Sequence, residues 1–124
     1  MAVVLAGALL LSSLSSDGAP VLETEEVPVP AVLSPRQYLF ASYPSIAPRM
    51  ACVIQKESRW DPVAQNPYSG AAGLTQILLS TWLTTPPGRR GESRFNAYSN
   101  LDGAAWLVTA GGGWRHWAAT IGGC

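Results

Sequence analysis

One carboxylate in this sequence stands where it could act as an acid, that of Glu57. At about 100° per residue, the positions Met50, Val53, Ile54 and Glu57 fall in one narrow helical stripe. The stripe is otherwise apolar, so the pattern predicts that Glu57 faces the buried side of its helix. Burial without a nearby cation raises the pKa of a carboxyl group, and a general acid at neutral pH needs such a pKa. The alternative is a helix-end Glu that turns to solvent or pairs with Arg59.

The segment after Glu57 is rich in Gly, Asn and Pro, which indicates turns. Asp61 precedes a proline, a position more typical of a turn than of a second catalytic acid. Gln76 falls in the first turn of a helix predicted at about 75–84. Its amide can donate and accept hydrogen bonds at once, which suits an N-acetyl group, although a solvated Gln is the alternative.

The same stretch resembles the catalytic core of the lytic transglycosylases, which are relatives of goose-type lysozyme. The family pattern is Glu-Ser, then Asn/Asp-Pro-x-Ala, then Gly-Ala-x-Gly-Leu-Met-Gln. This sequence has, in the same order, Glu57-Ser58, Asp61-Pro62-x-Ala64 and Gly70-Ala71-x-Gly73-Leu74-x-Gln76. The resuscitation-promoting factors carry a similar Cys-x-x-x-x-Glu-Ser start, which is found here from Cys52.

The resemblance implies a mainly α, lysozyme-like single domain of about five short helices around a glycan cleft. It implies cleavage of the β-1,4 bond between N-acetylmuramic acid and N-acetylglucosamine in peptidoglycan, leaving 1,6-anhydromuramyl ends. Glu57 would be the general acid and then the base, with Ser58 orienting it, and no cofactor or metal would be needed. The sugar-binding residues that it suggests are Gln76, Gly73, Leu74, Asn66 and Trp114.

The sequence departs from the family pattern at three places. Thr75 stands where Met is usual, and Leu79 stands where Pro is usual. The late Ala-Tyr-Asn motif, whose Tyr helps to set the catalytic Glu, has no clear match. Either the activity is lower than is usual in the family, or Trp114 closes the site in a different way.

Two other functions fit parts of the pattern. A lysozyme-type hydrolase would need a second acid opposite Glu57, and Asp61 and Asp102 are the candidates. A non-catalytic peptidoglycan-binding module would fit the missing Tyr motif and the five Trp. Those Trp are either core residues or a surface for stacking sugars.

Length and composition limit the function further. The chain has 124 residues, enough for one domain, and its net charge is zero with 13% charged residues. A neutral chain lacks the basic surface that nucleic acid requires, so no nucleic-acid partner is expected. The partner that the resemblance implies is the peptidoglycan glycan strand, and we expect a monomer. A Ser/His/Asp triad or a metal cluster is not expected, because His116 is the only His.

The two cysteines, Cys52 and Cys124, predict one disulfide if the protein is exported, and two separate buried thiols are the alternative. Cys52 falls almost opposite the Glu57 stripe, so a bridge would fasten the C-terminus to the back of that helix. A loop of this length would gain about 4 kcal/mol from the cross-link. We expect reduction to lower the melting temperature by several degrees or more.

The remaining elements must hold this site, and the pattern places them as follows. Residues 1–18 are apolar and resemble a secretory signal, with a buried N-terminal helix or strand as the alternative, and 19–33 form a Pro/Glu-rich linker. The domain is 34–124. Its predicted helices are at about 34–42, 47–58, 75–84 and 100–109, with a polar loop over 86–95 and a last turn at 114–117. The apolar run is too short to span a bilayer, so no stable membrane span is expected. As a secretory signal it would direct the protein to the cell wall or periplasm, and association with a virion is the alternative.

Overall fold

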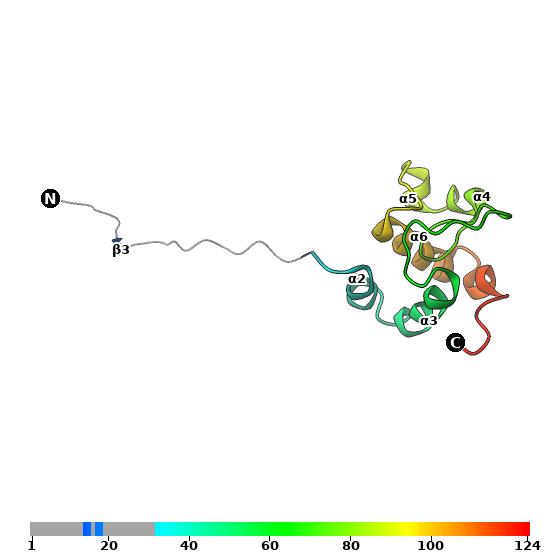
Figure 1. Ribbon diagram of the computed structural model, residues 1–124, viewed down its shortest axis with the longest axis horizontal. Coiled ribbons are helices and arrows are strands. Elements are labelled where there is room, and N and C mark those ends of the chain that lie inside the picture. The colour runs from blue at the N-terminus through cyan, green and yellow to red at the C-terminus, as the bar shows by residue number, and fades with distance from the viewer. Residues whose placement is uncertain (1–13, 16, 19–31) are drawn as a thin grey trace. The chain divides into compact units, whose positions relative to one another are not determined.

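The computed structural model describes residues 32–124 and, nearer the N-terminus, residues 14–15 and 17–18 (Figure 1). The residues near the N-terminus form two short parallel strands, β2 (Leu14–Ser15) and β3 (Asp17–Gly18). A separate compact unit, Leu33–Cys124, contains all the predicted site residues. Most of the predicted signal and linker lies outside the described residues. Within the described part of the chain, no helix has the length and apolar character needed to cross a membrane.

Helices make up the regular structure of the compact unit, which confirms the mainly α prediction (Figure 1). In chain order they are α2 (Pro35–Ser42), α3 (Ala47–Glu57), α4 (Leu79–Trp82), α5 (Pro86–Arg89), α6 (Ala97–Ala110) and the 3₁₀ helix η2 (Gly113–Trp117). The first begins as predicted. Ser34 Oγ accepts a hydrogen bond from the backbone N–H of Gln37, and Gln37 Oε1 accepts one from that of Ser34.

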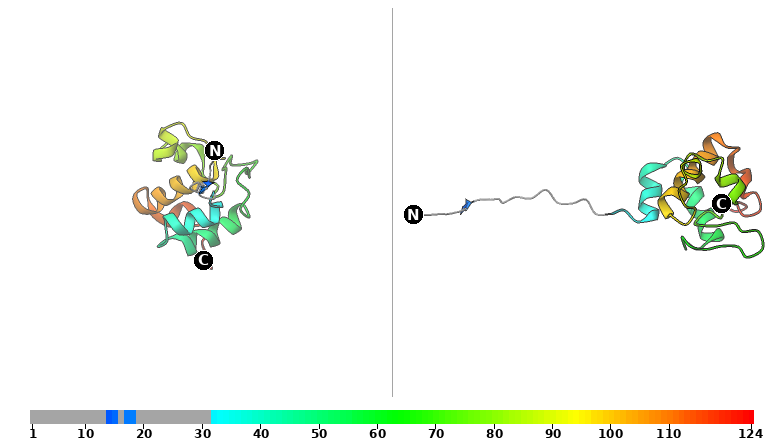
Figure 2. Two further views of the ribbon diagram at one scale, coloured as in Figure 1. Left: turned by 90° about the vertical axis from the view of Figure 1, so that its left-hand side faces the viewer. Right: turned by 90° about the horizontal axis from the view of Figure 1, so that it is seen from above.

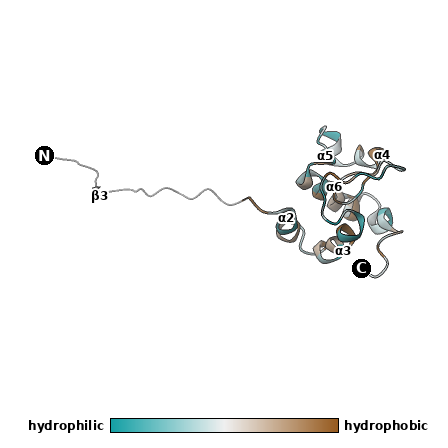
Figure 3. Cartoon of the chain, viewed as in Figure 1, coloured by the Kyte–Doolittle hydropathy of each residue, from teal (hydrophilic) through white to brown (hydrophobic). Residues whose placement is uncertain are grey.

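The central element is α6, which contacts α2, α5 and η2. In the left view of Figure 2, α6 runs through the body of the unit, with α2 and α3 below it and the segment that contains α5 above it. The α3 helix carries both hydrophilic and hydrophobic residues (Figure 3), and its buried apolar side chains belong to the same core cluster as those of α6. Met50 and Ile54 of α3 and Leu101 of α6 have no exposed surface, so the helix that ends at Glu57 is anchored in this core.

The helix predicted at about 75–84 is largely wrong, because α4 covers only Leu79–Trp82. The residues before it form a small antiparallel arrangement, with isolated bridges from Gln65 to Ala72 and from Ala72 to Ile77. Gln76 has φ +53°, a left-handed conformation in which an α-helix cannot start. The tertiary pairing of this loop overrides the local helical pattern.

The polar loop predicted over 86–95 contains a helix, α5. Thr85 caps it by accepting a hydrogen bond from the N–H of Gly88 at 3.1 Å, and Pro86 occupies the first helical position. Part of the stretch that we expected to be a loop is therefore helical.

The start predicted for the penultimate helix is also wrong. Asn96 caps α6, and its Oδ1 accepts hydrogen bonds from the backbone N–H groups of Tyr98 and Ser99 at 3.1 and 3.0 Å. Asn100, where we expected the helix to begin, lies inside it and is fully buried. An Asn–x–x–x–Asn sequence offers two possible caps, and only the tertiary structure selects between them.

Candidate active site

Glu57 is the last residue of α3 and is partly exposed, so it lies at the edge of the buried face and not in its middle. The three apolar residues that share its stripe are fully buried, as predicted. The Glu57 Oε2 atom accepts a hydrogen bond of 2.6 Å from Thr120 Oγ1. The carboxyl group is therefore held at one oxygen, while its position at the helix end leaves part of it open to solvent.

Ser58 fixes the end of α3 through the main chain and not through Glu57. Its hydroxyl donates to the carbonyl oxygen of Leu74 at 2.7 Å, with Ile54 O at 3.3 Å. Ser58 is buried, and Leu74 has no exposed surface. This contact joins the carboxylate-bearing helix to the loop that carries Gln76. Any part that Leu74 takes in sugar binding is indirect.

Asn66 organises the tip of the loop that follows α3. Its Oδ1 accepts hydrogen bonds from the N–H groups of Tyr68 and Ser69 at 2.8 and 3.0 Å, and its own N–H donates to Ala71 O. Such a turn fixes the course of the chain without needing a ligand. The side chain is exposed, so it is also accessible from outside.

Gly73 is required by the packing of the protein itself. Its φ is +84°, and a Cβ built there would lie 2.2 Å from Arg94 O and 2.3 Å from Asn100 Nδ2. No side chain fits such a position. The sequence pattern correctly identified a glycine that the fold needs. The reason in the structure is close contact with Arg94 and with Asn100 of α6, and not contact with a sugar.

The buried Asn100 holds the segment 70–76, called here the glycine loop, against α6. The sequence did not reveal this role. Its Oδ1 accepts hydrogen bonds from the backbone N–H and the hydroxyl of Thr75 at 3.0 and 2.6 Å. Its Nδ2 donates to Arg94 O at 2.9 Å. Thr75 thus replaces the usual Met with a hydroxyl that the buried amide needs as a partner.

Gln76 presents one end of its amide to the protein. Its Nε2 donates to Ala64 O and Gly73 O at 3.0 and 2.9 Å, and these two bonds use both of its N–H groups. Its Oε1 accepts no hydrogen bond from the described residues. The side chain is only partly buried, so this oxygen is available to a donor on a ligand.

The two late tryptophans play different parts. Trp117 is buried, and its indole N–H donates to Thr75 O at 2.8 Å, which adds a third connection to the glycine loop. Trp114 is partly buried, with its ring 5.9 Å from that of Trp117, and the Arg49 guanidinium lies 5.3 Å from its centre. Trp114 therefore packs at the edge of the core and keeps some exposed ring.

The C-terminal segment supplies the direct partner of Glu57, and the sequence analysis missed it. Cys52 and Cys124 form a disulfide with their Cα atoms 5.6 Å apart, which confirms the predicted pairing. Lys56 Nζ donates to Thr120 O at 3.3 Å and to Gly122 O at 2.5 Å. Thr120 is thereby held where its hydroxyl reaches Glu57. A lone Thr in a Gly-rich tail gives no local signal of such a role.

The two other acids considered for a hydrolase are bound to groups of the protein. Asp61 Oδ1 accepts from the N–H of Val63 at 3.0 Å, as in the predicted turn. Asp102 Oδ1 accepts from the hydroxyls of Tyr38 and Tyr43 at 2.7 and 2.6 Å. Burial, together with these bonds to Asp102, raises the pKa of both tyrosines. Neither acid has a described hydrogen bond to Glu57.

The fold and the site define a class of protein: small, mainly helical, lysozyme-like domains. Their acidic side chain lies at a helix end, beside a glycine loop. The family description "Transglycosylase SLT domain" matches residues 41–110, more than half of the sequence, and the chain belongs to this family. The match spans the segment from α2 to the end of α6, including Glu57 and the glycine loop, which confirms the resemblance to the lytic transglycosylases.

The chain is also similar to the proteins named "Probable transglycosylase SceD" in the Newman and USA300 strains of Staphylococcus aureus. Each is 42% identical to it over 67 residues, which cover 52% of this chain and 29% of the relative. The chain thus matches less than a third of the length of these relatives. No solved structure matches the chain.

Proposed function

We propose that the protein cleaves the β-1,4 bond between N-acetylmuramic acid and N-acetylglucosamine in peptidoglycan as a lytic transglycosylase. The observation that carries the proposal is the placement of Glu57. Its carboxyl group is held at one oxygen by Thr120 and lies at a partly exposed helix end, which Ser58 ties to the glycine loop. The family to which the chain belongs and the names of its relatives support the same reaction. Such a substrate places the protein outside the cytoplasm, where it would act as a monomer.

In the proposed reaction, Glu57 transfers a proton twice. Thr120 donates to Oε2, so Oε1 carries the proton that passes to the glycosidic oxygen as the bond to the muramyl anomeric carbon breaks. The acetamido group of the substrate assists at that carbon. The carboxylate then takes the proton of the muramyl 6-hydroxyl, and the oxygen closes the 1,6-anhydro ring. Glu57 regains its proton, no water is consumed and no second carboxylate is needed.

For sugar binding we propose Gln76 as the principal contact, since its free Oε1 can accept the N–H of an acetamido group. Trp114 offers exposed ring for stacking, and Asn66 offers an exposed amide at the loop tip. Gly73 and Leu74 would act by shaping the loop, because both are buried.

Mass analysis of a peptidoglycan digest tests the proposal. Soluble fragments with 1,6-anhydromuramyl ends are the expected products. Fragments with reducing ends would overturn the proposal in favour of a hydrolase. Binding to insoluble peptidoglycan with no fragments released would overturn it in favour of a wall-binding module.

We predict that Thr120→Val slows cleavage by roughly 10- to 100-fold, the effect of losing one hydrogen bond to a charged or acidic group. Val keeps the shape of Thr but cannot donate to Glu57 Oε2. Initial rates of fragment release measure the effect, and Thr120→Ser, which retains the hydroxyl, is the matched control. Equal rates for the Val variant and the wild type would show that this hydrogen bond does not orient the acid.

A further inference from the structure

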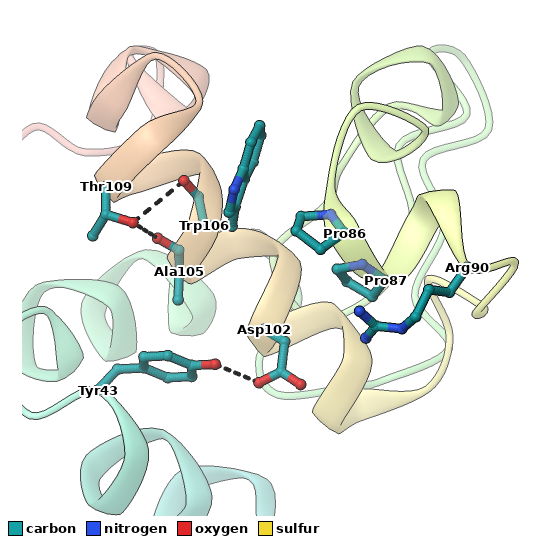
Figure 4. Close-up of a pocket in the computed structure, with 8 residues that line it drawn as sticks. All are labelled: Tyr43, Pro86, Pro87, Arg90, Asp102, Ala105, Trp106 and Thr109. Carbon is teal, nitrogen blue, oxygen red and sulfur yellow. Dashed lines mark hydrogen bonds between the residues drawn. The ribbon is translucent and has the colours of Figure 1, made fainter.

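A cavity that is separate from the Glu57 site lies between α5 and α6 and is bounded on one side by Tyr43, as Figure 4 shows. Its volume is about 470 Å³, within the range of roughly 300–1,000 Å³ that is usual for small-molecule sites. Glu57 and the glycine loop are not among the residues that line it. The proposed glycan reaction makes no use of this cavity.

One end of the cavity carries a carboxylate with a free oxygen. Tyr38 and Tyr43 both donate to Asp102 Oδ1, and each phenol has only one proton to give. Asp102 Oδ2 accepts no hydrogen bond from the described residues, and no cation among them forms an ion pair with this side chain. Figure 4 shows the carboxylate between Tyr43 and the α5 side of the cavity. An ammonium group would satisfy both the charge and the free oxygen.

The α5 side of the cavity carries a guanidinium group. Arg90 Nε donates to Glu92 Oε2 at 2.9 Å, and the described residues accept no hydrogen bond from its two terminal nitrogens. In Figure 4 these nitrogens point toward the cavity and not away from it. A guanidinium with free N–H groups is well suited to a carboxylate.

Apart from Tyr43 and Thr109, the other residues that line the cavity are apolar. Pro86, Pro87 and Ala105 line the cavity together with the ring of Trp106, against which the Arg89 guanidinium packs at 5.8 Å from the ring centre. These rings can bury an alkyl chain, as they have no polar atom that would need a partner apart from the indole N–H. The cavity therefore presents one negative group, one positive group and an apolar wall.

We propose that this cavity binds the zwitterionic end of an α-amino acid that has an alkyl side chain. The ammonium group would lie on Asp102 Oδ2, the carboxylate on the terminal nitrogens of Arg90, and the alkyl chain against Trp106 and the prolines. Two sources provide this chemistry, a free amino acid and the free end of a diamino acid in a wall peptide. Neither source requires Glu57, so the site does not depend on the proposed glycan cleavage.

NMR titration of the full chain with D- and L-norleucine tests the proposal, with the Tyr43 and Trp106 ring signals as the readout. We expect shifts that saturate, and at least tenfold weaker binding for N-acetylnorleucine, which lacks the ammonium, and for norleucine amide, which lacks the carboxylate. Asp102→Asn and Arg90→Gln should each weaken norleucine binding at least tenfold. Arg36→Gln, an exposed arginine outside the cavity, should leave it unchanged.

Asp102→Asn also changes the contacts of the two tyrosines, so the Arg90→Gln variant is the decisive test of the proposal. The proposal would be overturned if Arg90→Gln bound norleucine as tightly as the wild type does. It would also be overturned if N-acetylnorleucine or norleucine amide bound as tightly as norleucine, or if no saturating shift appeared. A peptide ending in diaminopimelate that binds tighter than free diaminopimelate would identify the wall peptide as the source. Equal affinities would identify the free amino acid. The Glu57→Gln variant should bind norleucine as the wild type does, so failure here is distinct from failure of the glycan reaction.

Discussion

Replacing Glu57 with Gln is expected to lower the rate of fragment release from peptidoglycan by about 10²–10⁴-fold, the range attributed to a general acid. The amide has nearly the shape of the acid, and its oxygen can still accept the hydrogen bond from Thr120. What it lacks is a proton that can pass to the glycosidic oxygen. Initial rates on purified peptidoglycan measure the loss, and thermal unfolding should show a melting temperature close to that of the wild type.

Asp61→Asn is the matched control for this variant. The Asp61 carboxylate accepts a hydrogen bond from the N–H of Val63 in a surface turn, and an amide oxygen can replace it there. We expect this variant to keep most of the activity. If Asp61→Asn were as impaired as Glu57→Gln, a two-carboxylate hydrolase would explain the data better. A Glu57→Gln variant with the wild-type rate would remove the basis of the proposed function.

Local signals in the sequence were sufficient for the elements near the start of the domain. Ser34 and Gln37 stand at the spacing of a capping box, which forms at the start of α2 with Pro35 in its first turn. The apolar stripe of α3 is buried, because helical periodicity alone decides which residues face the core. The Cys52–Cys124 pair was also predictable, since an exported chain with two cysteines has only one way to pair them.

Features that depend on distant contacts could not be predicted in this way. Asn100 has the sequence context of a helix cap, yet its burial and its bonds to Thr75 and Arg94 arise only when α6 meets the glycine loop. The positive φ of Gln76 is a result of the same packing. Thr120 lies 63 residues after its partner Glu57, in a tail with no periodicity. Such contacts have no local pattern that indicates them.

The disulfide should determine both stability and activity, because it anchors the segment that contains Thr120. Its 72-residue separation corresponds to about 4 kcal/mol in the chain-entropy model. For a domain of this size, such a loss lowers the melting temperature by roughly 15 °C or more. We therefore expect this shift, in thermal unfolding, for the reduced protein and for the Cys52→Ser, Cys124→Ser double variant.

Activity measured below the unfolding transition separates the two effects of the disulfide. Without the bridge, the end of the tail is no longer fixed, and Thr120 is held near Glu57 by Lys56, the turn contacts of the tail and the packing of Ile121 against the core. We therefore expect the folded double variant to cleave more slowly than the wild type. Thr120→Val should share this loss of rate without the large change in melting temperature. A double variant that melts at the wild-type temperature would show that the bridge does not stabilise the fold. One that is less stable yet fully active while folded would show that Lys56 and the packing of Ile121 hold the tail in place without the bridge.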